Sequence, residues 1–331
     1  MRVERQVRWL NRTPELRRDG PEDDLSSRRT THHTPGIYTA IAALFCTNAL
    51  LIPRLTVADN LVVQEIRPSE ADPAITRFNE PNYIVWNEQS GLDSQLVVFM
   101  PGTNGKPSNS AAFLRRVATL GYRVIGLEYN DEPAVIQVCP QIQLASCSGD
   151  FRQRRIFGGD VKSVVENTQS ESIINRIVSL LRYLQEHDAA RHWDGYLLNE
   201  EPNWSRIVIS GLSQGAGMAA YIAKHRSVAR VVLFSSPWDF QRSSQRLAPW
   251  LIEPSETPPD RWFAEYHRRE KTAALIASAY QALQIPKSNI RIFDIDLPKD
   301  MKFKSDNPYH GSTIRVPAYA PEWEFLFGRS P

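Results

Sequence analysis

The chain has 331 residues, enough to bury one sizeable core, and its formal charge at neutral pH is +2. Charged residues make up 23% of it, so bulk electrostatics gives no reason to expect a nucleic-acid partner. The three cysteines form no C-x-x-C pair and no cluster with histidine, so the sequence indicates no metal and no other cofactor.

The first 58 residues are predicted to be a leader. Residues 1–36 are polar, with arginines among the acids, and are expected to be disordered. Residues 37–52 are almost uncharged but short for a membrane-spanning helix, and the small-residue pattern after them favours cleavage after Ala58. Residues 37–58 are therefore interpreted as a signal peptide or a membrane anchor of a secreted or membrane-anchored extracytoplasmic protein. Because the polar segment is long for a signal, either translation starts after Met1 or the run is an uncleaved anchor; an ordinary core helix is the remaining interpretation.

A single domain is predicted over residues 59–331. Asn82–Asn87 is interpreted as an edge strand, and the continuous apolar run Leu96–Met100 as a central parallel strand covered on both faces. A helix over Ser110–Leu120 and a strand over Tyr122–Tyr129 follow. This alternation predicts right-handed crossovers and a mostly parallel sheet.

Residues 130–167 break the alternation and are interpreted as a long irregular insertion, either a functional lid or pocket wall or a surface decoration. If the chain is exported, Cys139 and Cys147 are expected to form a disulfide that closes a short loop. The arginines at positions 152, 154 and 155 either meet an anionic group or, as we prefer, form a solvated face. An amphipathic helix is predicted next, over Ser172–His187.

The stretch Arg206–Gly217 is the most informative part of the chain. Alternating β-branched residues predict a buried strand, Gly211-Leu212-Ser213-Gln214-Gly215 predicts a sharp turn, and an Ala-rich helical segment follows. Strand, turn and helix are the context that a G-x-S-x-G motif requires, so Ser213 is predicted to be a nucleophile lifted above the sheet edge. Downstream, strands are predicted over Ala229–Phe234, Arg261–His267 and Asn289–Ile295, and a helix over Lys271–Leu283.

A serine nucleophile needs a base and an orienting acid, and the order of strands suggests both. His310 is the histidine that follows the last predicted strand, which is the expected place for the base. Glu270 follows the strand two positions after the nucleophile strand and is the preferred acid. Asp239 is the alternative acid, with Asp294 or Asp296 third.

Two backbone donors are expected to stabilise the oxyanion. One is the N–H of Gln214, directly after the nucleophile, and the other is the N–H of Thr103, in the loop after Leu96–Met100.

The chain resembles the α/β-hydrolases and, more narrowly, a poorly characterised branch of exported serine hydrolases. The residues that carry the resemblance are Pro101–Pro107, Asn175–Leu184, Asn203–Val208 and Gly211–Ala220. It implies an eight-stranded, mainly parallel sheet flanked by helices and an ester-type acyl hydrolase. Related chains typically have His where Leu212 stands and Asp in the acid position, which Glu270 occupies here.

Three functions follow as hypotheses. The first is a serine hydrolase that cleaves a small or polymeric carboxylic ester through an acyl-enzyme. The second is a non-catalytic binding protein on the same fold, and the third is a peptidase or acyltransferase. Four aromatic residues either form an acyl pocket or, as is more common near strand ends, belong to the core: Tyr129, Trp238, Trp262 and Tyr309. Nothing in the sequence indicates an oligomeric state.

Overall fold

The computed structural model describes residues 60–242, 244–301 and 305–331. The predicted leader, residues 1–58, and its cleavage site therefore lie outside the described residues. Among those that are described, no helix is both long and apolar enough to cross a membrane.

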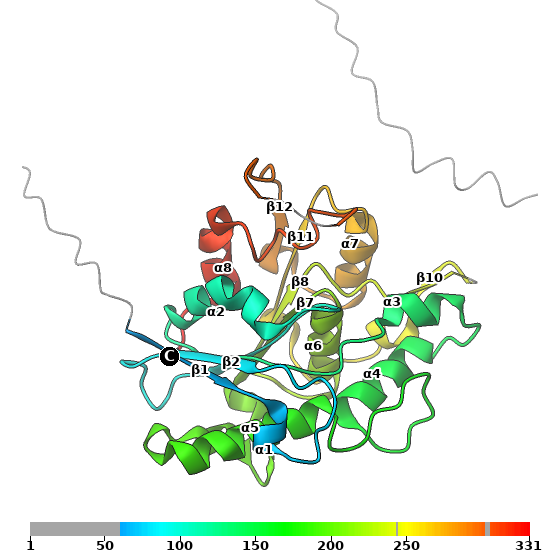
Figure 1. Ribbon diagram of the computed structural model, residues 1–331. Coiled ribbons are helices and arrows are strands. Elements are labelled where there is room, and N and C mark those ends of the chain that lie inside the picture. The colour runs from blue at the N-terminus through cyan, green and yellow to red at the C-terminus, as the bar shows by residue number, and fades with distance from the viewer. Residues whose placement is uncertain (1–59, 243, 302–304) are drawn as a thin grey trace, which may run out of the picture. The chain divides into compact units, whose positions relative to one another are not determined.

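An eight-stranded sheet forms the centre of the described region (Figure 1). Its order is β1-β2-β4-β3-β7-β8-β11-β12. The pairs β1–β2 and β2–β4 are antiparallel, and the six strands β4, β3, β7, β8, β11 and β12 are parallel to one another. The strands are β1 (Leu61–Ile66), β2 (Asn82–Asn87), β3 (Leu96–Met100), β4 (Arg123–Gly126), β7 (Ile207–Leu212), β8 (Arg230–Phe234), β11 (Trp262–His267) and β12 (Ile290–Phe293). Two short hairpins pair β5 (Leu197–Leu198) with β6 (Glu201–Pro202) and β9 (Phe240–Gln241) with β10 (Arg246–Leu247).

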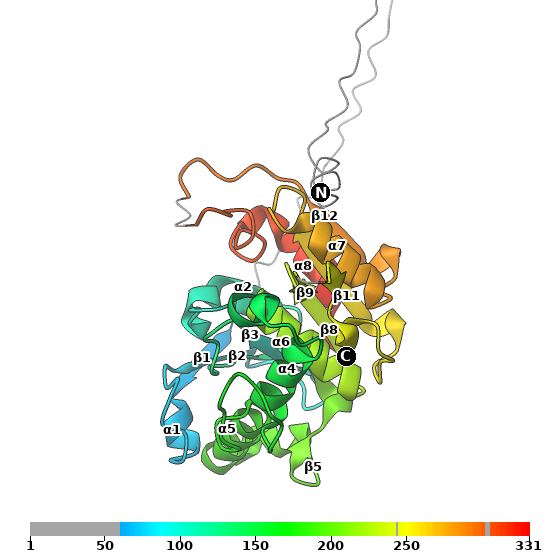
Figure 2. The same ribbon diagram turned by 90° about the vertical axis from the view of Figure 1, so that its right-hand side faces the viewer.

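Helices cover both faces of this sheet. They are α1 (Pro68–Ala71), α2 (Ala111–Ala118), α3 (Val135–Val138), α4 (Cys147–Phe157), α5 (Ile173–His187), α6 (Gln214–His225), α7 (Ala273–Ala282) and α8 (Ala320–Phe327). Side chains of α2 and α8 join one apolar core, and those of α4, α5, α6 and α7 join the other. On the second face, α4 packs against both α5 and α6 (Figure 2).

The strand β3 shows how the sequence pattern produces these layers. Every residue of β3 is buried. Leu96, Val98 and Met100 point into one core and Val97 and Phe99 into the other, because successive side chains of a strand alternate between faces. The predicted α/β-hydrolase fold, a mostly parallel eight-stranded sheet flanked by helices, is confirmed by this arrangement.

Two predictions about elements were wrong. Asn82–Asn87 is not an edge strand, because β1 pairs along its whole length and occupies the edge. The insertion at 130–167 is not irregular throughout, because it contains α3, α4 and a disulfide between Cys139 and Cys147. The helix α4 was missed because two of its buried positions are arginines, which hide the apolar stripe that signals a packed helix.

Candidate active site

Ser213 lies in the sharp turn between β7 and α6. Its backbone has φ 55° and ψ −119°, a conformation that L-residues rarely adopt. Such a strained conformation persists only where the surrounding structure enforces it. A side chain at Gly211 would come within 2.4 Å of the Gly215 carbonyl carbon, and one at Gly215 within 2.0 Å of the Met100 oxygen. Only glycine fits at these two positions, so the turn is held tightly against the end of β3.

His310 contacts Glu270 directly. The two side chains approach to 2.7 Å between His310 Nδ1 and Glu270 Oε2. Glu270 Oε1 accepts two further hydrogen bonds, from the Ser235 hydroxyl at 2.6 Å and from the His267 backbone N–H at 2.8 Å. The carboxylate is buried, whereas the imidazole is 20% exposed. Glu270 is therefore a fixed group that can orient the His310 ring through Nδ1 and leave Nε2 free.

Ser213 and His310 line one cavity of about 350 Å³. No hydrogen bond joins the Ser213 hydroxyl to His310 among the described residues, so the two groups share a site without a direct bond. Contacts of this kind are often long in a free hydrolase and shorten when the substrate is bound.

Asp239, the alternative acid, is engaged elsewhere. Arg152 donates to both of its oxygens, at 2.8 Å from Nε and 2.6 Å from Nη2, and Trp250 Nε1 donates to Oδ2 at 2.9 Å. The other rivals are on the surface, where Asp294 and Asp296 pair with Arg269. Of the four candidate carboxylates, Glu270 is the one in contact with His310.

The expected oxyanion donors border Ser213. Thr103 lies in the turn after β3, and a side chain at the preceding Gly102 would come within 3.1 Å of Ser213 Cβ. Gln214 opens α6, whose first N–H groups have no partner within the helix. Among the described residues neither the Thr103 N–H nor the Gln214 N–H donates a hydrogen bond. Both donors are thus free for a negatively charged oxygen.

The turn that carries Thr103 is held by residues of the segment that follows β4. The Tyr129 hydroxyl donates to the Pro101 carbonyl at 2.9 Å, and the Gly105 N–H donates to Asp131 Oδ2 at 3.1 Å. Burial raises the pKa of Asp131 to about 6, against the effect of the Gly105 N–H, which lowers it. Burial also raises the pKa of the adjacent Glu128 to about 7, with the charge of Asp131 adding to the effect.

A second carboxyl lies behind Glu270. Glu265, on β11, is fully buried, and neither of its oxygens has a hydrogen-bond partner in the part of the chain that is described. Burial and then the charge of Glu270 raise the pKa of Glu265 well above its usual range. Burial therefore disfavours the charged form of Glu265.

The arginine cluster is not a solvated face, contrary to expectation. Arg152 and Arg155 are buried, at 1% and 0% exposure, and Arg154 is half-buried. Arg152 packs over Gly217 of α6 and pairs with Asp239. Arg155 donates to the carbonyls of Glu132 and Pro133 and so fixes the start of the insertion.

The four aromatic candidates lie in different places. Trp238 is close to the site, with its ring 5.1 Å from the His310 ring. Tyr129 is core, Trp262 is buried at the start of β11, and Tyr309 stacks on His267. They do not form one acyl pocket.

Sequence reasoning missed the roles of Ser235 and Asp131, and it preferred a solvated face for Arg152. Ser235 directly follows β8 and Asp131 comes shortly after β4, so both stand at the carboxyl ends of parallel strands, the edge where Ser213 also lies. That position is a usable signal. Arg152 carries no such signal, because its partners come from distant parts of the chain.

No protein-family model and no curated protein sequence matches this chain. Solved structures that resemble it include bacterial heroin esterase, at 15% identity over 81% of this chain and 84% of that one, with a TM-score of 0.44. Esterase B from Lactobacillus rhamnosis is 13% identical over 81% of this chain and 87% of that one, with a TM-score of 0.45. Thermogutta terrifontis esterase 2 phosphoramylated by tabun is 14% identical over 80% of this chain and 95% of that one, with a TM-score of 0.43. At these identities and TM-scores the similarities carry no argument about activity.

Proposed function

We propose that this protein is a serine hydrolase that cleaves a carboxylic ester through an acyl-enzyme. Ser213 is the nucleophile, His310 the general base and acid, and Glu270 the orienting acid. The observation that carries the proposal is the 2.7 Å contact between Glu270 and His310 at the cavity that also holds Ser213 in its strained turn. A buried carboxylate fixed by two other donors, the Ser235 hydroxyl and the His267 N–H, is what an imidazole needs in order to keep its tautomer and to offset its charge.

The residues then divide the reaction into two steps. The Ser213 oxygen attacks the carbonyl carbon while its proton passes to His310 Nε2, and the carbonyl oxygen becomes an oxyanion that accepts from the Gln214 and Thr103 N–H groups. The bond from carbon to the alcohol oxygen breaks as His310 returns the proton to that oxygen. Water then attacks the acyl-enzyme, gives its proton to His310, and Ser213 leaves with that proton, releasing the acid.

A fluorophosphonate probe tests the proposal. We expect the wild-type protein to be labelled and to hydrolyse p-nitrophenyl acetate, and Ser213→Ala to lose both. Ser210→Ala is the matched control, because Ser210 is a buried serine of β7 with no hydrogen-bond partner for its hydroxyl among the described residues. Absence of labelling in the folded wild type would instead indicate the non-catalytic binding protein.

We also propose that the chain is exported. Support comes from the uncharged run at 37–52, the small residues before Asp59 and the disulfide between Cys139 and Cys147, a bond typical of oxidising compartments. We expect the native protein to begin near Asp59. N-terminal sequencing of protein from its natural source checks this, and recovery of residues 1–36 on it would overturn the cleavage.

A further inference from the structure

Two cavities of very different size meet at Ser213. The larger, about 350 Å³, is the one that contains His310. The smaller, about 30 Å³, is lined by Ser213 and Gln214 but not by His310, and Thr103 lines both. The nucleophile and one oxyanion donor therefore stand between two spaces, and the base faces only one of them.

The position of the base, His310, decides which part of an ester must lie in which cavity. In the mechanism proposed above, His310 must hand its proton to the departing alcohol oxygen. The alcohol must then lie in the cavity that contains His310, and the acyl group, on the other side of the carbonyl carbon, must lie in the small one. This assignment rests on the proposed function.

The small cavity has rigid walls. One wall is α3, through Val135 and Ile136, which the disulfide at Cys139 follows directly. Asp239 also lines the cavity, and Arg152 and Trp250 hold it with three hydrogen bonds. About 30 Å³ admits roughly two water-sized groups, which corresponds to a methyl or an ethyl group.

The lining is also unsuited to a long alkyl chain. Arg152 Nη1 and Gln214 Nε2 are buried and have no hydrogen-bond partner among the described residues. Both residues line the small cavity. An alkyl chain pressed against such donors would keep them from water and from any other acceptor, which is unfavourable.

We propose that the cavity formed by Ser213, Gln214, Val135, Trp238 and Asp239 is the acyl site, and that it selects esters of two- to three-carbon acids. The alcohol side is larger and of mixed character, since it is lined by polar residues such as Asn104, Lys106 and Arg315 and by apolar ones such as Leu212 and Ile314. The protein is on this assignment a short-acyl esterase and not a lipase for long chains.

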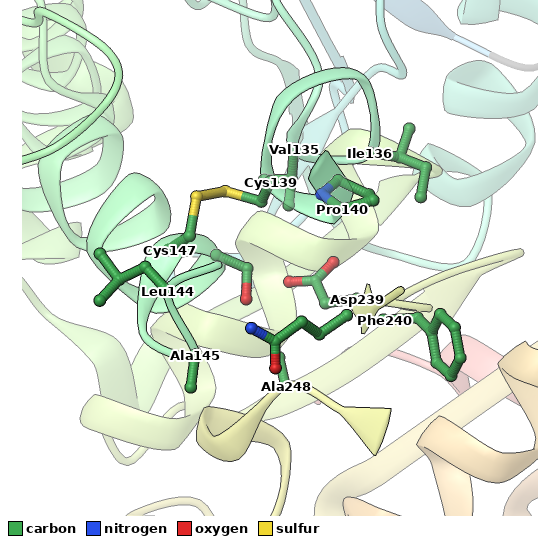
Figure 3. Close-up of a pocket in the computed structure, with 12 residues that line it drawn as sticks. Val135, Ile136, Cys139, Pro140, Leu144, Ala145, Cys147, Asp239, Phe240 and Ala248 are labelled. Carbon is green, nitrogen blue, oxygen red and sulfur yellow. A yellow bond between two sulfur atoms is a disulfide. The ribbon is translucent and has the colours of Figure 1, made fainter. Parts of the chain in front are cut away.

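A second pocket behind the wall supplies a variant that tests the assignment. This pocket is about 20 Å³, and Val135, Ile136 and Asp239 line it as well as the acyl site. Figure 3 shows it, with α3 and the disulfide on one side and Asp239, Phe240 and Ala248 on the other. Shortening Val135 removes part of the partition between the two pockets.

The experiment measures kcat/KM for p-nitrophenyl acetate, propionate, butyrate, hexanoate and octanoate, which share one alcohol. For the wild type we expect acetate and propionate to be the best substrates and hexanoate to be at least tenfold worse. For Val135→Ala we expect the ratio of hexanoate to acetate to rise at least tenfold. Val165→Ala, the same change at another buried valine that lines neither pocket, is expected to leave the ratio unchanged.

A second variant keeps the test decisive if Val135→Ala does not fold. Ile136 is 41% exposed, so Ile136→Trp is tolerated more easily and narrows the same site. We expect it to lower activity on propionate more than on acetate. A wild type that prefers hexanoate or octanoate, or variants that leave the acyl profile unchanged, would overturn the acyl-site assignment while the hydrolase proposal stands. Loss of all hydrolysis and probe labelling in the wild type would instead overturn the hydrolase proposal.

Discussion

Glu270 reaches His310 from a position three residues beyond the end of β11. Both of its oxygens are fixed, one by His310 and the other by Ser235 and His267. Glutamate is one methylene longer than aspartate, so its side chain spans a correspondingly longer gap. Asp239, by contrast, is bound by two strong donors on the far side of the small cavity.

Glu270→Gln is expected to lower kcat by roughly 10³ to 10⁴, because it keeps the shape of the side chain and removes the charge that orients the imidazole. The melting temperature should change little. Asp239→Asn should behave in the opposite way: it leaves the buried Arg152 charge unpaired, which costs about 3–5 kcal/mol of stability, with a smaller effect on kcat. Ester kinetics and urea denaturation of both variants check this, and unchanged kcat in Glu270→Gln would move the acid role to another residue.

Glu128 gives a prediction about stability and pH. Burial raises its pKa to about 7, whereas an unfolded glutamate has a pKa of about 4.3. Between these values the folded chain holds more protons than the unfolded one, so the stability that protonated Glu128 provides below about pH 4 is lost as pH rises through 7. Glu128→Gln should therefore exceed the wild type in stability by roughly 1–3 kcal/mol at pH 8 and by nothing at pH 4.

Urea denaturation at the two pH values measures this difference. Glu186→Gln, an exposed glutamate on α5, is the matched control and should show no pH-dependent gain. Equal stabilisation of Glu128→Gln at pH 4 and pH 8 would show that Glu128 is not the titrating group.

At the scale of elements, the turn between β7 and α6 depends on close backbone contact. Gly215→Ala places a methyl 2.0 Å from the Met100 carbonyl oxygen, so we expect a loss of at least about 3 kcal/mol or no soluble protein. Gly149→Ala is the control within α4, where the added methyl meets its nearest atom, Trp250 Cβ, at 3.8 Å. That change should stabilise the protein by up to about 1 kcal/mol, and thermal melting separates the two results.

The disulfide holds α3, which forms one wall of the small cavity. Replacing both Cys139 and Cys147 by serine should cost about 2–3 kcal/mol, as expected for a bond that closes so short a loop. We also expect the acyl-length preference to become broader, because the wall is then free to move. Denaturation with and without reductant is the measurement, and reductant should have no effect on the double variant.

The parts of the site that follow local pattern rules were predictable. Ser213 and its glycines form a motif within a strand, turn and helix, and His310 follows from its place after the last strand. Strand order favoured Glu270 over Asp239 as the acid. The pairing of Asp239 with Arg152 was not predictable, because Arg152 comes from α4 and carries no motif. The strand β1 was not predicted. Five of its six positions are half-buried or exposed, so it lacks the run of buried apolar residues that marks a central strand.

At the scale of the whole molecule, α8 packs on one face of the sheet, although it comes more than 100 residues after Ser213 in the sequence. The centroid of the Phe327 ring lies 5.9 Å from that of Phe113 and 6.2 Å from those of Tyr122 and Phe234. The Phe327 carbonyl accepts a hydrogen bond from the Tyr122 hydroxyl at 2.7 Å. This helix therefore ties β4, α2 and β8 together.

Phe327→Ala should cost about 3–5 kcal/mol, because it leaves a cavity at a fully buried position. Phe325→Ala, on the same helix but 37% exposed, should cost much less. Guanidinium denaturation followed by fluorescence measures both. Comparable losses would mean that α8 contributes through its whole surface and not through the core.

If the small cavity is the acyl site, as proposed, the sulfur–sulfur bond beside α3 would make the substrate profile depend on where the protein matures. A preparation folded in a reducing cytoplasm and one folded in an oxidising periplasm or secretory lumen would share every residue and still differ in how strictly they reject longer acids. The oxidation state of Cys139 and Cys147 would then have to be reported with every activity measured.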